Sequence, residues 1–535
     1  MKYTPSDLQA MITSAFSKVE NAKERFLKCE CAVKAREYNP KKFKTKNERD
    51  KLFVPLIKTT VQILHSIFQT SFMSKKCPID IDRIGEREND ADIRNALMAV
   101  IKHAWENSSH RIGLSRAVLS AISLPLGIAA LFWDRQENRI RTRFIPITDI
   151  AFDPNAIDIS DIEYVCYRTK VSIREVRENL KNGFYVLKDK GELFSESEHD
   201  NNRIQKDEIY VKSLNKSGER VWYLTTFIHN RIVRDKIEFR ELPFHFGYLI
   251  DNLPDIEYDI DDNESYIYGF SVAEVLFELQ REYNIKRNQK IRLVDRIIDP
   301  PRTIDKNSGA VSLSDIKNNE PFIRVETSQG KSVKDVVSVD YTPPQYPIGE
   351  ELGLLNEEYE KVSGLNSILL GQTSPSDRRA MGALQTVNAS SSLRIESMMQ
   401  TLVDTMLNSY ANHFAKLVYY NTTDSEFVNI TENPEIINII GTLGKRIPLE
   451  MNVRVNFGTV ISEEVKLSKL SNLLQILMQS GVVNAVIVEK LIQDIMVIIQ
   501  GENAAVEMIE PQQQEAPPSP TKEDIDREAL LRGGV

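Results

Sequence analysis

The sequence lacks the motifs through which common enzyme classes bind phosphate, activate a serine or hold a metal. No G-x-G-x-x-G follows a predicted strand, and neither G-x-S-x-G nor H-E-x-x-H occurs. The nearest approach to a phosphate-binding loop, Gly441–Lys445, has two residues between its glycines where four are needed. His103 and His110 lie two helical turns apart without a third metal ligand nearby. Together these absences argue against an enzyme, and we expect no cofactor and no metal.

Cysteine is scarce, and no secretion signal is visible. The chain has four cysteines, Cys29, Cys31, Cys77 and Cys166. The Cys-x-Cys pair has no second pair at zinc-site spacing, which favours free thiols over a metal site. The amino terminus lacks the apolar core of a signal peptide. These features are typical of an intracellular protein.

A long hydrophobic run occurs once. Residues Ala117–Trp133 carry no charge, but 17 residues are barely enough to span a membrane, and Pro125 and Gly127 interrupt the run. The pattern predicts a buried helix followed by a strand over 128–133, with no membrane span.

The 535 residues carry 68 Lys and Arg against 77 Asp and Glu, a net charge of −9. This balance argues against a protein coated in positive charge that grips nucleic acid. The charge is uneven, because residues 23–52 carry a net +6 and residues 251–266 a net −7. The acidic segment fits a calcium loop poorly: Glu264 replaces the required glycine, and Phe270 replaces the bidentate glutamate. An exposed acidic loop is the better interpretation.

Short alternating runs between residues 128 and 248 predict a mixed α+β region with antiparallel hairpins. A helix is expected over Ser172–Leu180, and a hairpin turn at Asn215–Gly218. The expected strands are Arg141–Ile145, Tyr164–Tyr167, Glu208–Leu214, Val221–Ile228 and Ile232–Glu238.

Two helices around a small insertion predict a protruding stalk. Ser271 with Glu274 forms a capping box, and helical apolar spacing then continues to Asp299-Pro300-Pro301. This gives one helix of about 28 residues, about 40 Å long. Residues 299–347 contain the strand candidates Thr303–Asp305, Phe322–Thr327 and Val336–Tyr341. A second helix runs over 348–363 and ends at Gly364.

The remaining sequence is mostly helical. Apolar spacing predicts a helix at 53–73 and a long helix from Arg378, followed by a strand at Met451–Asn456. Two further helices are expected at Glu463–Gln479 and Val482–Gln500, and the proline- and glutamine-rich end is expected to be disordered.

The order of these elements resembles the portal (head-to-tail connector) proteins of tailed double-stranded DNA bacteriophages, especially of short-tailed phages. Three passages carry the resemblance: Arg143–Asn155 leading to Asp161–Val165, Tyr268–Ser271 through to Pro301, and Gly364–Thr373 followed by Asp377–Ser397. The resemblance covers roughly residues 50 to 500. It implies an α+β, predominantly helical fold with an α/β wing, a two-helix stem, a small β-containing clip and a short helical crown, assembled as a ring.

On this chain the resemblance implies nine regions. They are an N-terminal helical and basic arm (1–50), the first part of the wing (51–268), stem helix 1 (269–298), the clip (299–347), stem helix 2 (348–363), a tunnel loop (364–377), a long wing helix and strand (378–460), a short crown (461–510) and a disordered tail (511–535). Gly269 and Ser271 begin the stem, and Pro300, Pro301 and Gly364 end its helices.

The resemblance also implies function and partners. A ring, usually of twelve subunits, would occupy one capsid vertex of the virion and be assembled in the host cytoplasm. Double-stranded DNA would be packaged and ejected through it without sequence preference. The packaging terminase, then tail or adaptor proteins, would dock on it, and it would contact the capsid protein.

A channel for DNA should not hold DNA tightly, so the acidic balance agrees with this role. Weak positioning contacts are expected from a few residues, of which the candidates are Lys286, Lys290, Arg292, Gln372, Arg378 and Arg379. The competing interpretation is that these stem cations pair with acids on a neighbouring subunit, and it is slightly favoured. Two other functions stay open: an enzyme acting on nucleic acid, such as a metal-dependent nuclease, and an intracellular capsid scaffold or adaptor without DNA contact.

Overall fold

A computed structural model describes most of the region before Gly458. The described residues are 3–36, 52–73, 77–81, 90–134, 136–187, 193–194, 202–252, 267–298, 303–304, 337–338, 347–365, 393–431 and 453–455. All of them fall in one structural unit, Met1–Gly458.

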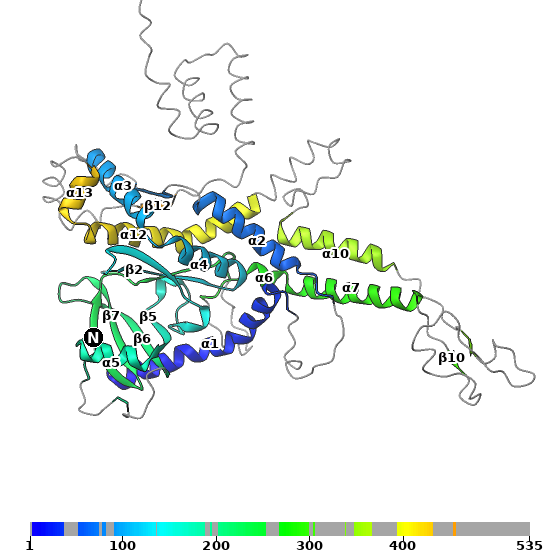
Figure 1. The fold of residues 1–535 in the computed structure, drawn as a ribbon, viewed down its shortest axis with the longest axis horizontal. Coiled ribbons are helices and arrows are strands. Elements are labelled where there is room, and N and C mark those ends of the chain that lie inside the picture. The colour runs from blue at the N-terminus through cyan, green and yellow to red at the C-terminus, as the bar shows by residue number, and fades with distance from the viewer. Residues whose placement is uncertain are drawn as a thin grey trace, which may run out of the picture. The chain divides into compact units, whose positions relative to one another are not determined.

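The unit contains both helices and strands, in runs of one type and in mixed order (Figure 1). The helices are α1 (Pro5–Val33), α2 (Leu56–Phe68), α3 (Asp90–Asn107), α4 (Arg111–Ser123), α5 (Ile173–Lys181), α6 (Val272–Val275), α7 (Phe277–Ile298), α10 (Ile348–Ser363), α12 (Asn408–Asn421) and α13 (Asp424–Thr431). The strands are β1 (Ile79–Ile81), β2 (Gly127–Asp134), β3 (Arg139–Phe144), β4 (Ile150–Phe152), β5 (Tyr164–Ser172), β6 (Arg203–Leu214), β7 (Arg220–Ile228), β8 (Arg231–Phe239), β9 (Phe244–Gly247), β10 (Thr303–Ile304), β11 (Val337–Ser338) and β12 (Val453–Val455).

The largest sheet confirms the predicted hairpins. Its five strands are antiparallel in the order β4-β5-β6-β7-β8. The β6–β7 turn forms where the sequence predicted it, since the Oδ1 atom of Asn215 accepts hydrogen bonds from the N–H groups of Ser217 and Glu219, each at 2.9 Å. Gly218 has φ of +80°, a conformation that glycine adopts without strain. The helix expected over Ser172–Leu180 is α5, and Ser172 is its N-cap.

The uncharged run at 117–133 folds as α4 followed by β2. A three-stranded antiparallel sheet has the order β3-β2-β9, and α4 packs against β2. A Cβ atom at Gly127 would lie 2.2 Å from the carbonyl oxygen of Ala117, so the helix and the strand can approach this closely because residue 127 is glycine. The predicted helix-to-strand break is confirmed. Among the described residues, no helix is long and apolar enough to cross a membrane.

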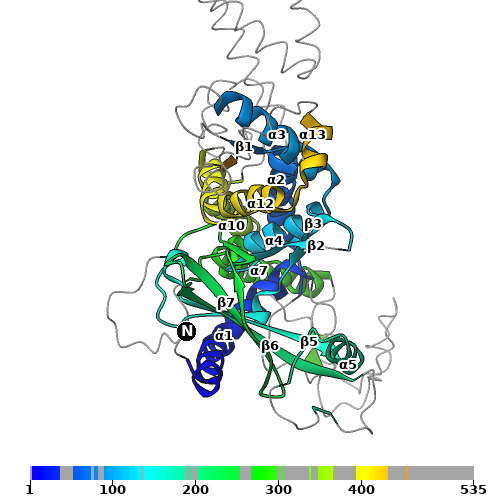
Figure 2. The same ribbon diagram turned by 90° about the vertical axis from the view of Figure 1, so that its left-hand side faces the viewer.

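Helix α1 contributes a full stripe to the core. Its buried residues recur every three or four positions, which places them on one helical face. From Leu8 to Phe26 that face joins the core formed with β4, β5 and β6, whereas Cys29 near the end of the helix contacts Ser271 (Figure 2). The residues are Leu8, Ile12, Ala15, Val19, Ala22, Phe26, Cys29 and Ala32. The helical part of the predicted arm 1–50 is therefore integral to the described core.

Segments far apart in sequence pack together beside the three-stranded sheet. Strand β12 pairs antiparallel with β1, which confirms the strand expected at Met451–Asn456. Trp105 of α3 is fully buried, with ring centroids 3.8 Å from His110 and 5.3 Å from Phe414 of α12. The helix expected at 53–73 is α2, which continues into a π-helical turn over Gln69–Met73.

Several predicted elements lie outside the described residues. The helix expected from Arg378 is helical over 393–421, with a π-helical turn at Val403–Leu407. Strands β10 and β11 pair with one another and match two of the three strand candidates of the predicted clip. Outside the described residues fall the third strand candidate at 322–327, the tunnel loop beyond Leu365, the helix over 378–392, the crown (461–510), the tail (511–535) and most of the acidic segment.

Candidate functional site

The predicted stalk is an antiparallel pair of helices, α7 and α10, which lie side by side in Figure 1. Ser271 caps the first helix, because its Oγ atom accepts a hydrogen bond from the N–H of Glu274 at 3.1 Å. Gly269 precedes it in a tight passage, where a Cβ atom would lie 2.5 Å from the carbonyl oxygen of Ile250. Ser271 therefore caps the helix that it was predicted to begin, and Gly269 lies two residues before it.

The single helix predicted up to Ile298 is wrong in one respect. The helix breaks at Leu276, which separates the four-residue α6 from the 22-residue α7. The predicted capping box is also only half formed, because the carboxylate of Glu274 pairs with Arg25 of α1 instead of the Ser271 N–H. A contact across 249 residues has overridden the local pattern, and local spacing does not reveal it.

Gly364 ends α10 as predicted. Its φ of +72° is left-handed, and its N–H donates to the carbonyl of Glu360 at 3.0 Å. Arg394, at the start of the next described helical segment, donates to the carbonyl of Lys361 at 2.9 Å. The end of α10 is thus capped by glycine and by an arginine from a later segment.

The three described cations among the DNA-channel candidates are in different environments. Lys286 of α7 donates to Oε1 of Glu351 on α10 at 3.1 Å, so it pairs with an acid of the same chain. Lys290 is half-buried, with its Nζ 3.7 Å from a Cβ position at Gly349, and Arg292 is exposed. Within the described residues, neither Lys290 nor Arg292 has an ion pair. The candidates Gln372, Arg378 and Arg379, and the helix-ending Pro300 and Pro301, lie outside those residues.

The ion pair between Lys286 and Glu351 should stabilise the helix pair modestly. Both side chains are less than a third exposed, at 23% and 30%. A double-mutant cycle with Lys286→Met and Glu351→Gln, measured by urea unfolding, should give a coupling free energy of about 1 kcal/mol. The exposed pair Arg281 and Glu278 on the same helix is the control and should couple more weakly. Equal couplings for the two pairs would contradict a joining role for Lys286.

Sequence reasoning missed the residues that join the stalk to the rest of the unit. Both helices bond to α2: Gln280 of α7 accepts from the Ile57 N–H at 2.7 Å, and Tyr359 of α10 shares a 2.9 Å hydrogen bond with Thr60. Burial raises the pKa of Tyr359, so its hydroxyl stays protonated. The signal that could have revealed these residues was the recurrence of amide side chains, instead of apolar ones, at helical spacing along α7.

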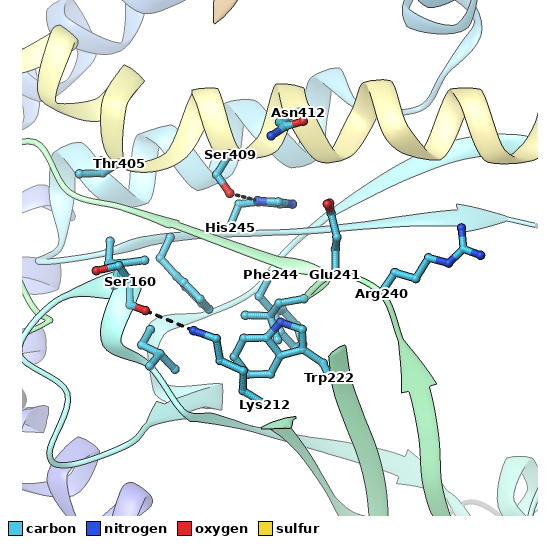
Figure 3. A pocket seen from close by; sticks show the side chains of 14 residues that line it. Ser160, Lys212, Trp222, Arg240, Glu241, Phe244, His245, Thr405, Ser409 and Asn412 are labelled. Atoms are coloured by element: carbon cyan, nitrogen blue, oxygen red, sulfur yellow. Dashed lines mark hydrogen bonds between the residues drawn. The ribbon is translucent and has the colours of Figure 1, made fainter. Parts of the chain in front are cut away.

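A pocket of about 320 Å³ lies between the large sheet and α12 (Figure 3). In it, His245 of β9 bonds through Nδ1 to the Ser409 hydroxyl at 3.0 Å, and through Nε2 to Nδ1 of His413 at 3.0 Å. Burial lowers the pKa of His245 well below its usual value and that of His413 to about 4. Both imidazoles are therefore neutral near pH 7.

This chain of a serine and two histidines resembles a nucleophile, its base and an orienting group. Ser409, however, lies in α12, whose backbone N–H groups are bonded within the helix. These N–H groups therefore cannot form the backbone oxyanion hole that acyl-transfer enzymes commonly use. The arrangement instead joins β9 to α12 through buried hydrogen bonds.

The four cysteines are free thiols in the structure. Burial raises the pKa of Cys29 and of Cys77 to about 11, so these thiols are protonated and weakly nucleophilic. Within the part of the chain that the structure describes, no three His, Cys, Asp or Glu side chains gather as a metal site would require.

Comparison with known families gives one extensive match. A family model described as the phage SU10 portal protein matches residues 7–532 of the chain. The match includes nearly all of α1, the three-stranded and five-stranded sheets and the α7–α10 pair. No curated protein matches the chain significantly.

Proposed function

The chain belongs to the phage SU10 portal protein family, and we propose that twelve copies of it close into a ring at one vertex of the capsid. Portal proteins are structural, capsid-associated oligomers of the virion. In this proposal the ring is a conduit through which double-stranded DNA is packaged and ejected, and the chain performs no chemical step. Assembly takes place in the host cytoplasm. The packaging terminase docks on the ring first and tail or adaptor proteins later.

The observation that carries the proposal is the helix pair α7–α10. It is anchored at its base by hydrogen bonds to α2, yet it presents large apolar side chains to solvent. These residues are Ile285 (48% exposed), Val294 (43%), Ile297 (52%), Ile298 (76%) and Leu354 (59%). Val294, Ile297 and Ile298 lie on one side of α7, and Ile285 on the opposite side. In a ring every subunit contact is head-to-tail, so the face formed by Val294, Ile297 and Ile298 can be buried against the next copy around the whole circle. We assign α7 and α10 to the stem and the β10–β11 pair to the clip.

The charges of α7 suit a weak, sliding contact with DNA. Lys286 is neutralised by Glu351, whereas the channel candidates Arg292, which is exposed, and Lys290, which is half-buried, have no ion pair among the described residues. A few unpaired cations on an acidic chain attract phosphates weakly and lose that attraction as salt rises. We propose that Arg292 lines the channel and that Lys290 supports it, with Gln372, Arg378 and Arg379 as channel candidates from the tunnel-loop region.

Salt-dependent DNA binding tests this function. A short duplex should bind the wild-type ring weakly at low salt. It should dissociate below about 200 mM salt, because phosphate contacts weaken strongly over this range. Arg292→Gln should lower the slope of log affinity against log salt. Arg220→Gln, an exposed arginine at the start of β7, is the control and should leave the slope unchanged. A slope unaffected by Arg292→Gln would remove that residue from the channel, and no binding at any salt would favour a scaffold without DNA contact.

A further inference from the structure

Three amide side chains on one face of α7 bind the backbone of residues 52–57. The Oδ1 of Asn288 accepts from the Leu52 N–H at 3.0 Å, and the Oδ1 of Asn284 accepts from Val54 at 2.8 Å. The Oε1 of Gln280 accepts from Ile57 at 2.7 Å. We call Gln280, Asn284 and Asn288 the amide ladder.

The spacing of the ladder matches an extended chain. Its members are four residues apart, about 6 Å along a helix at 1.5 Å per residue. Two residues of extended chain cover about 6.6 Å, which matches the step from Leu52 to Val54. The next step, from Val54 to Ile57, takes three residues because the chain enters α2 there. The last contact falls at Ile57, whose N–H belongs to the first turn of α2 and has no partner within that helix. Gln280 therefore caps α2 from outside, where Pro55 at the N-cap supplies no side-chain bond.

Burial makes these hydrogen bonds sensitive to the position of α7. Gln280 and Asn284, 3% and 9% exposed, are the buried residues of α7. A buried amide that loses its partner keeps its desolvation cost, so a shift of α7 along residues 52–57 is unfavourable. Apolar packing alone would tolerate such a shift far better, because it has no fixed donor and acceptor positions.

A second set of contacts, made by Arg25, holds the segment that precedes the break at Leu276. Arg25 of α1 pairs with Glu274 of α6, and its Nη2 donates to the Gly269 carbonyl at 2.7 Å. The Arg25 guanidinium also lies 5.1 Å from the centre of the Phe270 ring. The N-terminal part of the chain thus binds the segment before the break through Arg25 and the segment after it through residues 52–57.

We propose that Arg25 and residues 52–57 form a brace that sets the direction of α7 relative to the sheets, with Gln280, Asn284 and Asn288 as its positioning residues. The inference rests on the proposed ring. In a ring, a fixed direction of the stem helix fixes the width at which the circle closes, and hence the number of subunits. Loosening the brace allows several directions and therefore rings of several sizes.

The test combines amide exchange with ring counting on the full chain. Gln280→Met with Asn284→Leu keeps side-chain volume but removes the acceptors, and Gln289→Met, at an exposed glutamine of α7, is the matched control. The double variant should speed hydrogen exchange at Val54 and Ile57 at least tenfold and give rings of mixed subunit number by electron microscopy. The control should match the wild type in both. Faster exchange with rings of uniform, wild-type size would overturn the brace.

A milder variant keeps the test informative if the double variant fails to fold. Asn288→Ala removes only the outermost, half-buried member of the ladder, and should speed exchange at Leu52 while Val54 and Ile57 stay protected. Loss of protection at all three amides together would show that they do not form a ladder. If the wild-type chain stays monomeric, the proposed ring fails, yet the exchange pattern still tests the ladder within one chain.

Discussion

Replacement of Ile298 by aspartate is expected to leave the protein monomeric at concentrations where the wild type forms rings. Ile298 ends α7 with 76% of its surface exposed, and Val294 lies one helical turn before it. Burying an isoleucine against a neighbour stabilises a contact by about 1.5–3 kcal/mol, and aspartate would add the cost of burying a charge. Because every contact in a ring is the same, the loss recurs at each one.

Sedimentation velocity over a concentration series measures this effect. At about 1.4 kcal/mol per tenfold change, the protein concentration for half-assembly should rise at least tenfold in Ile298→Asp. The matched control is Ile112→Asp, because Ile112 of α4 is 71% exposed and lies outside the α7–α10 pair. If both variants assemble as the wild type does, the exposed face of α7 is not a subunit contact. If both fail equally, the effect is not specific to the stem.

Acid is expected to destabilise the unit through its buried histidines. His413 has a pKa of about 4 in the folded state against 6.5 for an ordinary histidine, because burial disfavours its charged form. Glu241 opposes this lowering and Lys416 adds to it, and His245 faces His413 from β9. Between pH 6.5 and about 4 the unfolded chain binds a proton that the folded chain does not. The free energy of unfolding therefore falls as the pH falls through this window, by about 3 kcal/mol for this group.

Urea unfolding at pH 7, 5.5 and 4.5 tests the pH dependence. His413→Asn should be less stable than the wild type at pH 7, because His245 loses its partner, but its stability should fall less steeply with acid. Burial lowers the pKa of His110 to about 3, so His110 should contribute part of the loss of stability in acid in both proteins. His103→Asn, at an exposed position of α3, is the control and should follow the wild type. Parallel curves for His413→Asn and the wild type would show that His413 is not the group responsible.

Local signals in the sequence predicted local structure well. The β6–β7 hairpin follows from Asn215 and Gly218, whose side chain and backbone freedom make the turn. Ser271 caps a helix and Gly364 ends one, because capping depends on residues only a few positions away. The short alternating runs likewise become strands of an antiparallel sheet.

Contacts between distant segments could not be predicted in the same way. The loss of half the capping box depends on Arg25, which lies 249 residues from Glu274. The amide ladder was missed because helical periodicity was sought in apolar side chains, whereas the residues that α7 buries are Gln280 and Asn284. The pairing of Lys286 with an acid was expected across subunits, but the structure places its partner, Glu351, in the same chain.

Electron microscopy of the purified, full-length protein tests the central claim most directly. The account predicts closed rings of twelve subunits with a central hole wide enough for a DNA duplex. The same preparation, mixed with short duplex DNA at low salt, should show density in the hole that disappears as salt is raised. Particles that remain uniform monomers across the concentration series, or rings whose hole is too narrow for a duplex, would contradict the assignment of α7 and α10 to a DNA channel.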